Sequence, residues 1–218
     1  MKKLLIDLFL SLEQENTSGI INDEKEYVFY AKLKDLSILK SAISVEEQEQ
    51  WTIKIPKTSE NLTKGTMRVR ETVKDGVTTY ALTVKTPLND AQGVFSQNNT
   101  SASTGMQKMR EVAIDATEGT FELFKLMANS GMKKIRYTLP IEDNDCVFEV
   151  DCFLTPNGKY SEWVKIDLEV KEPLSDIPEL PECFTDVIYN QEGSKTPEEN
   201  ELITRLYDEV FLIKRDNV

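Results

Sequence analysis

Three basic residues lie close together in the segment KGTMRVRETVKDGVTTYALTVKTP, residues 64–87. Arg68 and Arg70 are two positions apart, and side chains two apart in an extended strand point to the same side. Two guanidinium groups on one face repel each other unless they are solvated or an anion lies between them. The segment therefore predicts either a solvated strand edge or an anion site, with Lys85 as a further candidate cation.

These residues belong to a predicted β-hairpin, because the turn signal Asp75-Gly76 separates two strand-like runs. Helical spacing occurs in residues 35–44 and 117–131, where Gly131 is expected to end the helix. Thr196 and Glu199 predict a capping box at the start of a C-terminal helix. The polar segment 87–108 predicts a long loop. Further strands are predicted at residues 24–33, 49–56, 109–115, 133–140, 146–154 and 161–170.

Several predicted strands carry pairs of like charges on one face. An antiparallel sheet with one solvated side would place such charges outward. If the sheet closes with its charged faces inside, the charges need pairing, hydration or a ligand. A polyanion with a divalent cation meets this need, because arginine binds phosphate oxygens and carboxylates hold the cation. The pairs are Glu24/Glu26, Arg68/Arg70, Lys134/Arg136, Glu149/Asp151 and Asp167/Glu169.

Composition excludes several classes of function. The net charge of −12 argues against a broad nucleic-acid surface. The chain has no histidine, which excludes histidine-dependent nucleophiles and histidine-ligated zinc and favours oxygen-ligated Mg²⁺ or Mn²⁺. Its three cysteines lack metal-site spacing and fit reduced thiols in the cytoplasm. No apolar run is long enough to cross a membrane, and the start MKKLLIDLFLSLEQ predicts an amphipathic helix rather than a signal peptide.

The order of these motifs resembles the CYTH superfamily, the triphosphate tunnel metalloenzymes. This family includes thiamine triphosphatases, inorganic triphosphatases and class IV adenylyl cyclases. The resemblance runs from about Glu24 to Val170 and is carried by Arg-x-Arg, LTVK, MREVAI, KKIRY, EVDCF and KIDLEV. It implies a β-rich α+β fold: a closed antiparallel barrel of about eight strands with flanking helices, whose lumen binds a triphosphate and Mg²⁺ or Mn²⁺.

The resemblance also implies roles for individual residues. The phosphate-binding residues would be Arg68, Arg70, Lys85, Arg110, Lys134 and Arg136. The metal ligands would be Glu24, Glu26, Asp151, Asp167 and Glu169, and the last three would also be catalytic. The family's first-strand signature is Glu-x-Glu-x-Lys, but Val28 occupies the lysine position here. Glu47 and Glu49 offer a competing placement, with Trp51 at the lysine position.

Two functions remain open at this stage. The first is metal-dependent hydrolysis of a triphosphate, which could be inorganic, thiamine-linked, a nucleotide or an RNA 5′ end. The second is a binding protein or sponge for a nucleotide or a phosphorylated RNA end, which the missing lysine and the long polar loop favour. A structural protein without a ligand would leave the charge pairs unexplained. The expected organisation is a helical extension over 1–22, a barrel core over 23–171, and a proline-rich connector with a packed C-terminal helix over 172–218.

Overall fold

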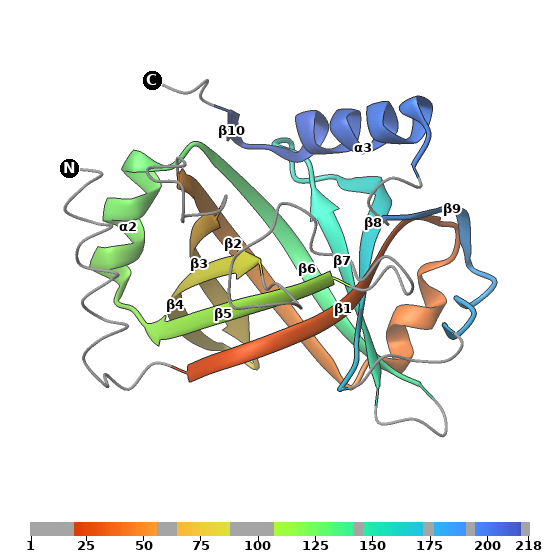
Figure 1. Ribbon diagram of the computed structural model, residues 1–218, viewed down its shortest axis with the longest axis horizontal. Coiled ribbons are helices and arrows are strands. Elements are labelled where there is room, and N and C mark those ends of the chain that lie inside the picture. The colour runs from red at the N-terminus through yellow and green to blue at the C-terminus, as the bar shows by residue number, and fades with distance from the viewer. Residues whose placement is uncertain are drawn as a thin grey trace.

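The computed structural model describes residues 20–55, 65–87, 107–141, 146–171, 177–190 and 195–214 (Figure 1). Its strands are β1 (Ile20–Leu33), β2 (Ser44–Ile55), β3 (Gly65–Lys74), β4 (Val77–Pro87), β5 (Gln107–Asp115), β6 (Ser130–Pro140), β7 (Val147–Leu154), β8 (Tyr160–Glu169), β9 (Phe184–Tyr189) and β10 (Ile213–Lys214). Its helices are the 3₁₀ helix η1 (Leu36–Ser41), α2 (Glu118–Met127) and α3 (Pro197–Val210).

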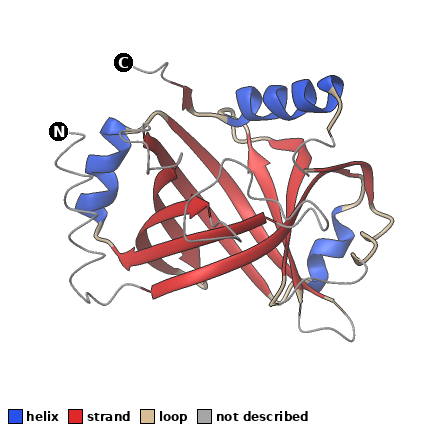
Figure 2. Cartoon of the chain, in the orientation of Figure 1, coloured by secondary structure: helices blue, strands red, loops and turns tan. Residues whose placement is uncertain are grey.

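Pairing places eight of these strands in a ring. The path runs β6-β2-β3-β4-β5-β1-β8-β7, and every pair in it is antiparallel. The last strand also pairs with the first, from Lys133 opposite Leu154 to Pro140 opposite Val147. β9 adds to β1, and β10 adds to β6. The β-rich antiparallel fold predicted from the sequence, with few helices, is therefore confirmed (Figure 2).

The β3–β4 hairpin is also confirmed. Lys74 pairs with Val77, which leaves a loop of two residues. Asp75 and Gly76 have φ values of 50° and 76°. Positive φ at both positions is the requirement of a type I′ turn, whose twist matches that of the strands it joins. The hairpin thereby fixes Arg68 and Arg70 in register with β4.

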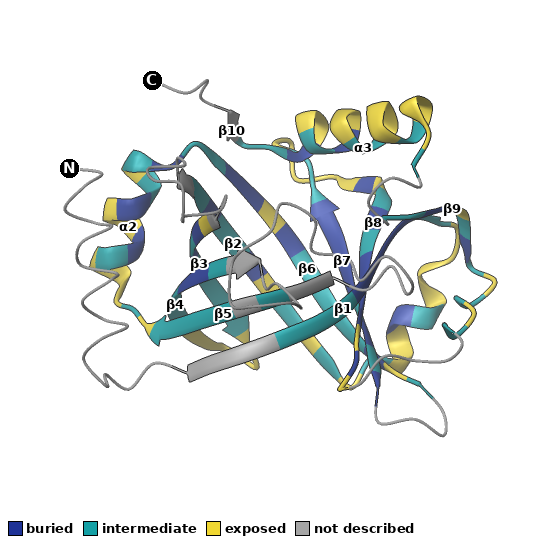
Figure 3. Ribbon diagram, in the orientation of Figure 1, coloured by how far each residue is buried: buried dark blue, intermediate teal, exposed yellow. Residues whose placement is uncertain are grey.

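Buried residues are interspersed with more exposed ones along strands such as β6 (Figure 3), and the buried apolar side chains form clusters with the elements that flank the ring. Trp51, Val69 and Val84 pack against Phe121 and Phe124 of α2 in one buried cluster. A second cluster covers the outer faces of β1, β7 and β8 with residues from η1 and β9. Because side chains alternate along a strand, burial of these outer faces directs the charged residues between them into the ring.

Helix α3 packs over one end of the ring (Figure 1). Val28 and Phe153 form a buried cluster there with Leu206 and Val210 of the helix. The Tyr30 and Tyr207 hydroxyls lie 2.8 Å apart. The predicted capping box at the start of α3 is present. Val28 is therefore an apolar residue of the layer between the ring and α3.

Three details differ from the sequence prediction. α2 ends at Met127, and Gly131 lies in β6, where a Cβ would come 2.3 Å from Trp51 Cε3. The glycine is thus required by close packing and does not end the helix. The predicted connector contains β9. Of the expected helical extension, residues 20–22 begin β1. Residues 1–19 and most of the predicted loop, 88–106, lie outside the described residues.

Candidate functional site: a charged cavity inside the ring

A cavity of about 310 Å³ lies inside the ring, and all eight strands contribute to its lining. Within the described parts of the chain, the cations that line it are Arg68, Arg70, Lys85, Lys134, Arg136 and Lys165. The carboxylates are Glu24, Glu26, Glu111, Glu149, Asp151, Asp167 and Glu169. Opposite charges are therefore nearly balanced in number, and their arrangement decides what the cavity can bind.

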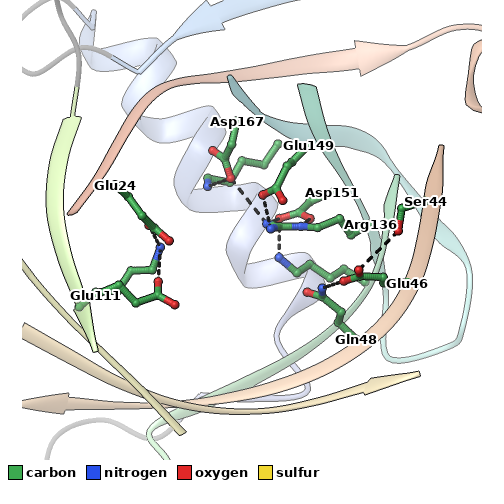
Figure 4. A network of polar contacts seen from close by, with 12 residues as sticks. Glu24, Ser44, Glu46, Gln48, Glu111, Arg136, Glu149, Asp151 and Asp167 are labelled. Carbon is green, nitrogen blue, oxygen red and sulfur yellow. Dashed lines mark hydrogen bonds and ion pairs between the residues drawn. The ribbon is translucent and has the colours of Figure 1, made fainter. Parts of the chain in front are cut away.

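One half of the charged lining forms a connected set of ion pairs (Figure 4). Asp151 accepts from Lys134 Nζ at 2.5 Å and from Arg136 Nε at 2.7 Å. Arg136 also contacts Glu149 and lies 3.7 Å from Asp167. Lys165 Nζ lies 2.5 Å from Asp167 Oδ2. We call this set the ion-pair network, and its members are Lys134, Arg136, Glu149, Asp151, Lys165 and Asp167.

The network neutralises its own charges. Burial alone would raise the pKa of Asp151, but Arg136 and Lys134 hold it well below its usual range. Burial alone would lower the pKa of Arg136, but Asp151 and Glu149 raise it well above the ordinary value. Lys134 is the exception, because burial and the neighbouring Arg136 lower its pKa to about 7 despite the contact with Asp151.

The remaining three cations differ in how well they are compensated: Lys85 has two carboxylate partners, Arg68 one distant partner and Arg70 none in the described residues. Lys85 contacts Glu24 and lies 2.8 Å from Glu111, whereas Arg68 lies 3.7 Å from Glu111. Within the described residues, Arg70 has no ion pair, and the Nε atoms of both arginines are buried without a hydrogen-bond partner. Burial, with repulsion from Arg68 and Arg136, lowers the pKa of Arg70 to about 10. We call Arg68 and Arg70 the arginine pair.

Three carboxylates of β1 and β8 lie close together in the cavity: Glu24, Glu26 and Glu169. Glu26 of β1 is directly opposite Glu169 of β8. Burial, with repulsion from Glu149 and Glu24, raises the pKa of Glu169 to about 7. Burial also raises the pKa of Glu24 and of Glu26. A bound cation or proton would relieve this repulsion.

The donor set fits a hard divalent cation, although no group of three acidic or cysteine side chains in the described chain is already arranged to hold one. Carboxylate oxygens are the ligands that Mg²⁺ and Mn²⁺ prefer. Glu24, Glu26 and Glu169 carry such oxygens, and their raised pKa values show that their negative charges are unfavourable without a cation. Asp151 and Asp167 are instead held by the cations of the ion-pair network.

All but one of the residues predicted for the site line this cavity. The exception is Arg110, whose side chain lies outside the described part; its neighbour Glu111 lines the cavity. Sequence reasoning missed Glu111, Lys165, Gln50 and Tyr207. Alternation could have revealed two of these, because Glu111 alternates with Val112, and Lys165 shares a face with Asp167. Tyr207 reaches the cavity only through the packing of α3.

Comparison with known proteins leaves the family open. No family model and no curated protein matches the sequence. Among solved structures, the chain is similar to the PH1819 protein from Pyrococcus horikoshii OT3, with a TM-score of 0.41 and 15% identity over 88% of this chain and 94% of that one.

Two further structures resemble it at a similar level. HpAC1 from Hippeastrum, described as having a dominant triphosphatase activity, gives a TM-score of 0.40 and 9% identity over 68% of this chain and 80% of that one. A chain of the Schizosaccharomyces pombe Mediator head module gives a TM-score of 0.37 and 10% identity over 84% of this chain and 92% of that one. These similarities are too distant to argue a function. No helix in the described residues is long and apolar enough to cross a membrane.

Proposed function

We propose that the protein is a metal-dependent triphosphate hydrolase. The phosphates of its substrate would bind between the arginine pair and Lys85. The observation that carries this proposal is Arg70, a half-buried cation beside a second guanidinium, which makes no ion pair in the described chain and whose buried Nε has no hydrogen-bond partner there. A buried charge without a partner is unfavourable, and an oligophosphate would neutralise it. A cavity of about 310 Å³ suits a compact phosphate chain.

Lys134 and Arg136 have a smaller direct part in this proposal than the sequence resemblance implies. Their charges are already matched by Asp151 and Glu149. They would hold Asp151 and Asp167 in place and add positive potential behind the phosphates. The proposed site thus has a charge-balanced network on one side and, on the other, the arginine pair, of which only Arg68 has an ion pair in the described residues.

Glu24 and Glu26, with Glu169 beside them, would hold a Mg²⁺ or Mn²⁺ ion. When bound, such an ion neutralises phosphoryl oxygens and polarises the bond to be broken. Glu169, an exposed carboxylate at the end of β8, would accept a proton from the water that attacks the terminal phosphorus. The bridging P–O bond breaks with its electron pair on the departing diphosphate, whose charge Arg68 and Arg70 stabilise.

Phosphate release from tripolyphosphate, thiamine triphosphate and ATP, with Mg²⁺ or Mn²⁺, tests the proposal. We expect release with at least one substrate, and a loss of about 100-fold or more in Glu169→Gln with binding equal or tighter. Glu162→Gln changes an exposed acid on the same strand and should leave the rate unchanged.

One observation favours a second candidate, a non-hydrolytic binding protein for a nucleotide or a phosphorylated RNA end. Val28 is 2% exposed within the apolar cluster under α3, so the first strand supplies no lysine at this position. Wild-type protein that binds a triphosphate tightly but releases no phosphate with either metal would establish this alternative over the hydrolase.

A further inference from the structure

An apolar surface on the outside of the ring adjoins the point where the chain enters β1. Val112 and Ile114 of β5 point outward, because Glu111 lines the cavity and side chains alternate along a strand. Both are only half-buried, and neither belongs to a buried apolar cluster of the described residues. An apolar strand face is stable when another element packs on it, so this part of β5 needs a partner.

Leu123 of α2 borders the same surface. Phe121 and Phe124 pack the helix on β2, β3 and β4, and Lys125 lies 2.8 Å from Glu49 of β2. Leu123 is two positions before Lys125, about 200° around the helix, and therefore lies on the side turned away from β2. In the strand order β2-β3-β4-β5 this is the side of β5. Leu123 is 56% exposed, and we call it, with the two outward residues of β5, the α2–β5 surface.

The first residues of the chain have the pattern of an element that would cover this surface. Residues 1–19 lie outside the described residues, and the sequence of 1–14 predicts an amphipathic helix. Leucines recur there at spacings of three and four, which places them on one face of the helix. This leucine stripe consists of Leu4, Leu5, Leu8 and Leu12. A helix of this length would be about 21 Å long, enough to lie along the whole of α2.

The chain connection limits where this helix can lie. β1 begins at Ile20, which pairs with Ala113, the residue between Val112 and Ile114. The segment 15–19 between the predicted helix and β1 can span roughly 20 Å at most. The end of the helix is therefore held close to the α2–β5 surface, and docking there costs little chain entropy.

We infer that residues 1–14 form an amphipathic helix that docks on the α2–β5 surface through its leucine stripe. The charges of the segment favour this partner over a lipid surface. Helices that lie on membranes are rich in Lys and Arg, whereas Lys2 and Lys3 are balanced here by Asp7 and Glu13. The inference concerns the outer face of the ring and does not depend on the proposed function.

Melting temperatures of full-length variants test the inference. Leu8→Glu puts a charge into the stripe and should lower the melting temperature by about 4–8 °C. Leu10→Glu is the matched control, because Leu10 lies about 200° from Leu8 on the predicted helix. It should change the melting temperature by less than about 1 °C. Leu123→Glu should act like Leu8→Glu, whereas Leu202→Glu, at an exposed leucine of α3, should act like the control.

The double variant Leu8→Glu/Leu123→Glu tests whether the two side chains belong to one contact. It should melt within about 1 °C of the less stable single variant, because the second substitution has no contact left to remove. Fully additive shifts would overturn the inference, and so would a Leu123→Glu variant as stable as Leu202→Glu. If the charged variants do not fold, Leu8→Ala and Leu123→Ala give the same comparison with smaller shifts.

Two further results would assign these side chains to another partner and overturn the inference. One is a wild-type dimer in light scattering that Leu123→Glu converts to a monomer, which would make the surface an interface between two copies. The other is flotation of the wild type with phosphatidylserine vesicles that is lost in Leu8→Glu and retained in Leu10→Glu. We expect neither, because the leucine stripe is already buried within its own chain.

Discussion

Arg70 and Arg136 line the same cavity, yet their surroundings shift their pKa values in opposite directions. Burial and two neighbouring arginines lower the pKa of Arg70 to about 10. Burial acts on Arg136 as well, but Asp151, Glu149 and Asp167 surround it and raise its pKa well above the ordinary value. The charged form of the guanidinium is therefore stabilised at Arg136 and destabilised at Arg70.

The difference separates charges that support the fold from charges available to a ligand. A buried ion pair stabilises little by itself, but removing one partner leaves an uncompensated charge and is costly. Removing a cation that already lacks a partner carries no such cost. The ion-pair network and the arginine pair should therefore respond oppositely to substitution, although both are buried and charged.

The largest effect is expected for Asp151→Asn in the ion-pair network. The substitution leaves Lys134 and Arg136 buried without this shared counter-charge, which should lower the free energy of unfolding by about 3–5 kcal/mol. In urea unfolding, Glu162→Gln, which breaks an exposed contact with Lys32, should cost less than about 1 kcal/mol. Equal costs for the two variants would mean that the network does not hold the fold together.

The second prediction compares the two arginines directly. Arg136→Met should destabilise the protein by about 2–4 kcal/mol, because three carboxylates lose their shared cation. Arg70→Met should leave the ligand-free protein equally stable or raise its stability by up to about 1 kcal/mol. Chemical unfolding of both variants measures the difference in their free energies of unfolding. A loss of stability in Arg70→Met as large as that in Arg136→Met would contradict the proposed difference between the two arginines.

A smaller effect is expected for Glu169→Gln, and it depends on pH. The folded protein binds a proton at Glu169 up to about pH 7, whereas the unfolded chain releases it near pH 4.5. Ionisation in the crowded cavity therefore lowers stability as pH rises between these values. Because Glu169 is partly solvated, the variant should melt only about 2 °C higher at pH 8 and unchanged at pH 4. An equal rise in melting temperature at pH 4 would show that ionisation of Glu169 is not the cause of the effect.

Much of the fold could be predicted from local sequence. Asp75-Gly76 defines the hairpin turn, and Thr196 with Glu199 defines the start of α3. β9 could not be predicted, because its pairing with β1 depends on contacts distant in sequence. The sequence predicts a helix end at Gly131, because nothing in it shows that Trp51 packs against this glycine.

The sequence predicts part of the candidate site, because the alternation of side chains along a strand shows which residues share a face. Like-charge pairs such as Arg68/Arg70 identified the face that lines the cavity. Alternation cannot show which opposite charges meet across the ring, so the division between the ion-pair network and the arginine pair emerged only from the structure. Nor can it show that Val28 contacts α3; the comparison with a lysine at this position came from the family resemblance alone.

The most direct test of the central claim is the shift in melting temperature caused by tripolyphosphate. Ligand at about 100 times its dissociation constant adds about 2.7 kcal/mol of stability, which corresponds to a rise of roughly 5–10 °C for a chain of this size. We expect that shift in the wild type. We expect none in the double variant Arg68→Ala/Arg70→Ala, which should still fold with a ligand-free melting temperature no lower than that of the wild type. An undiminished shift in the double variant would mean that the phosphates do not bind at the arginine pair.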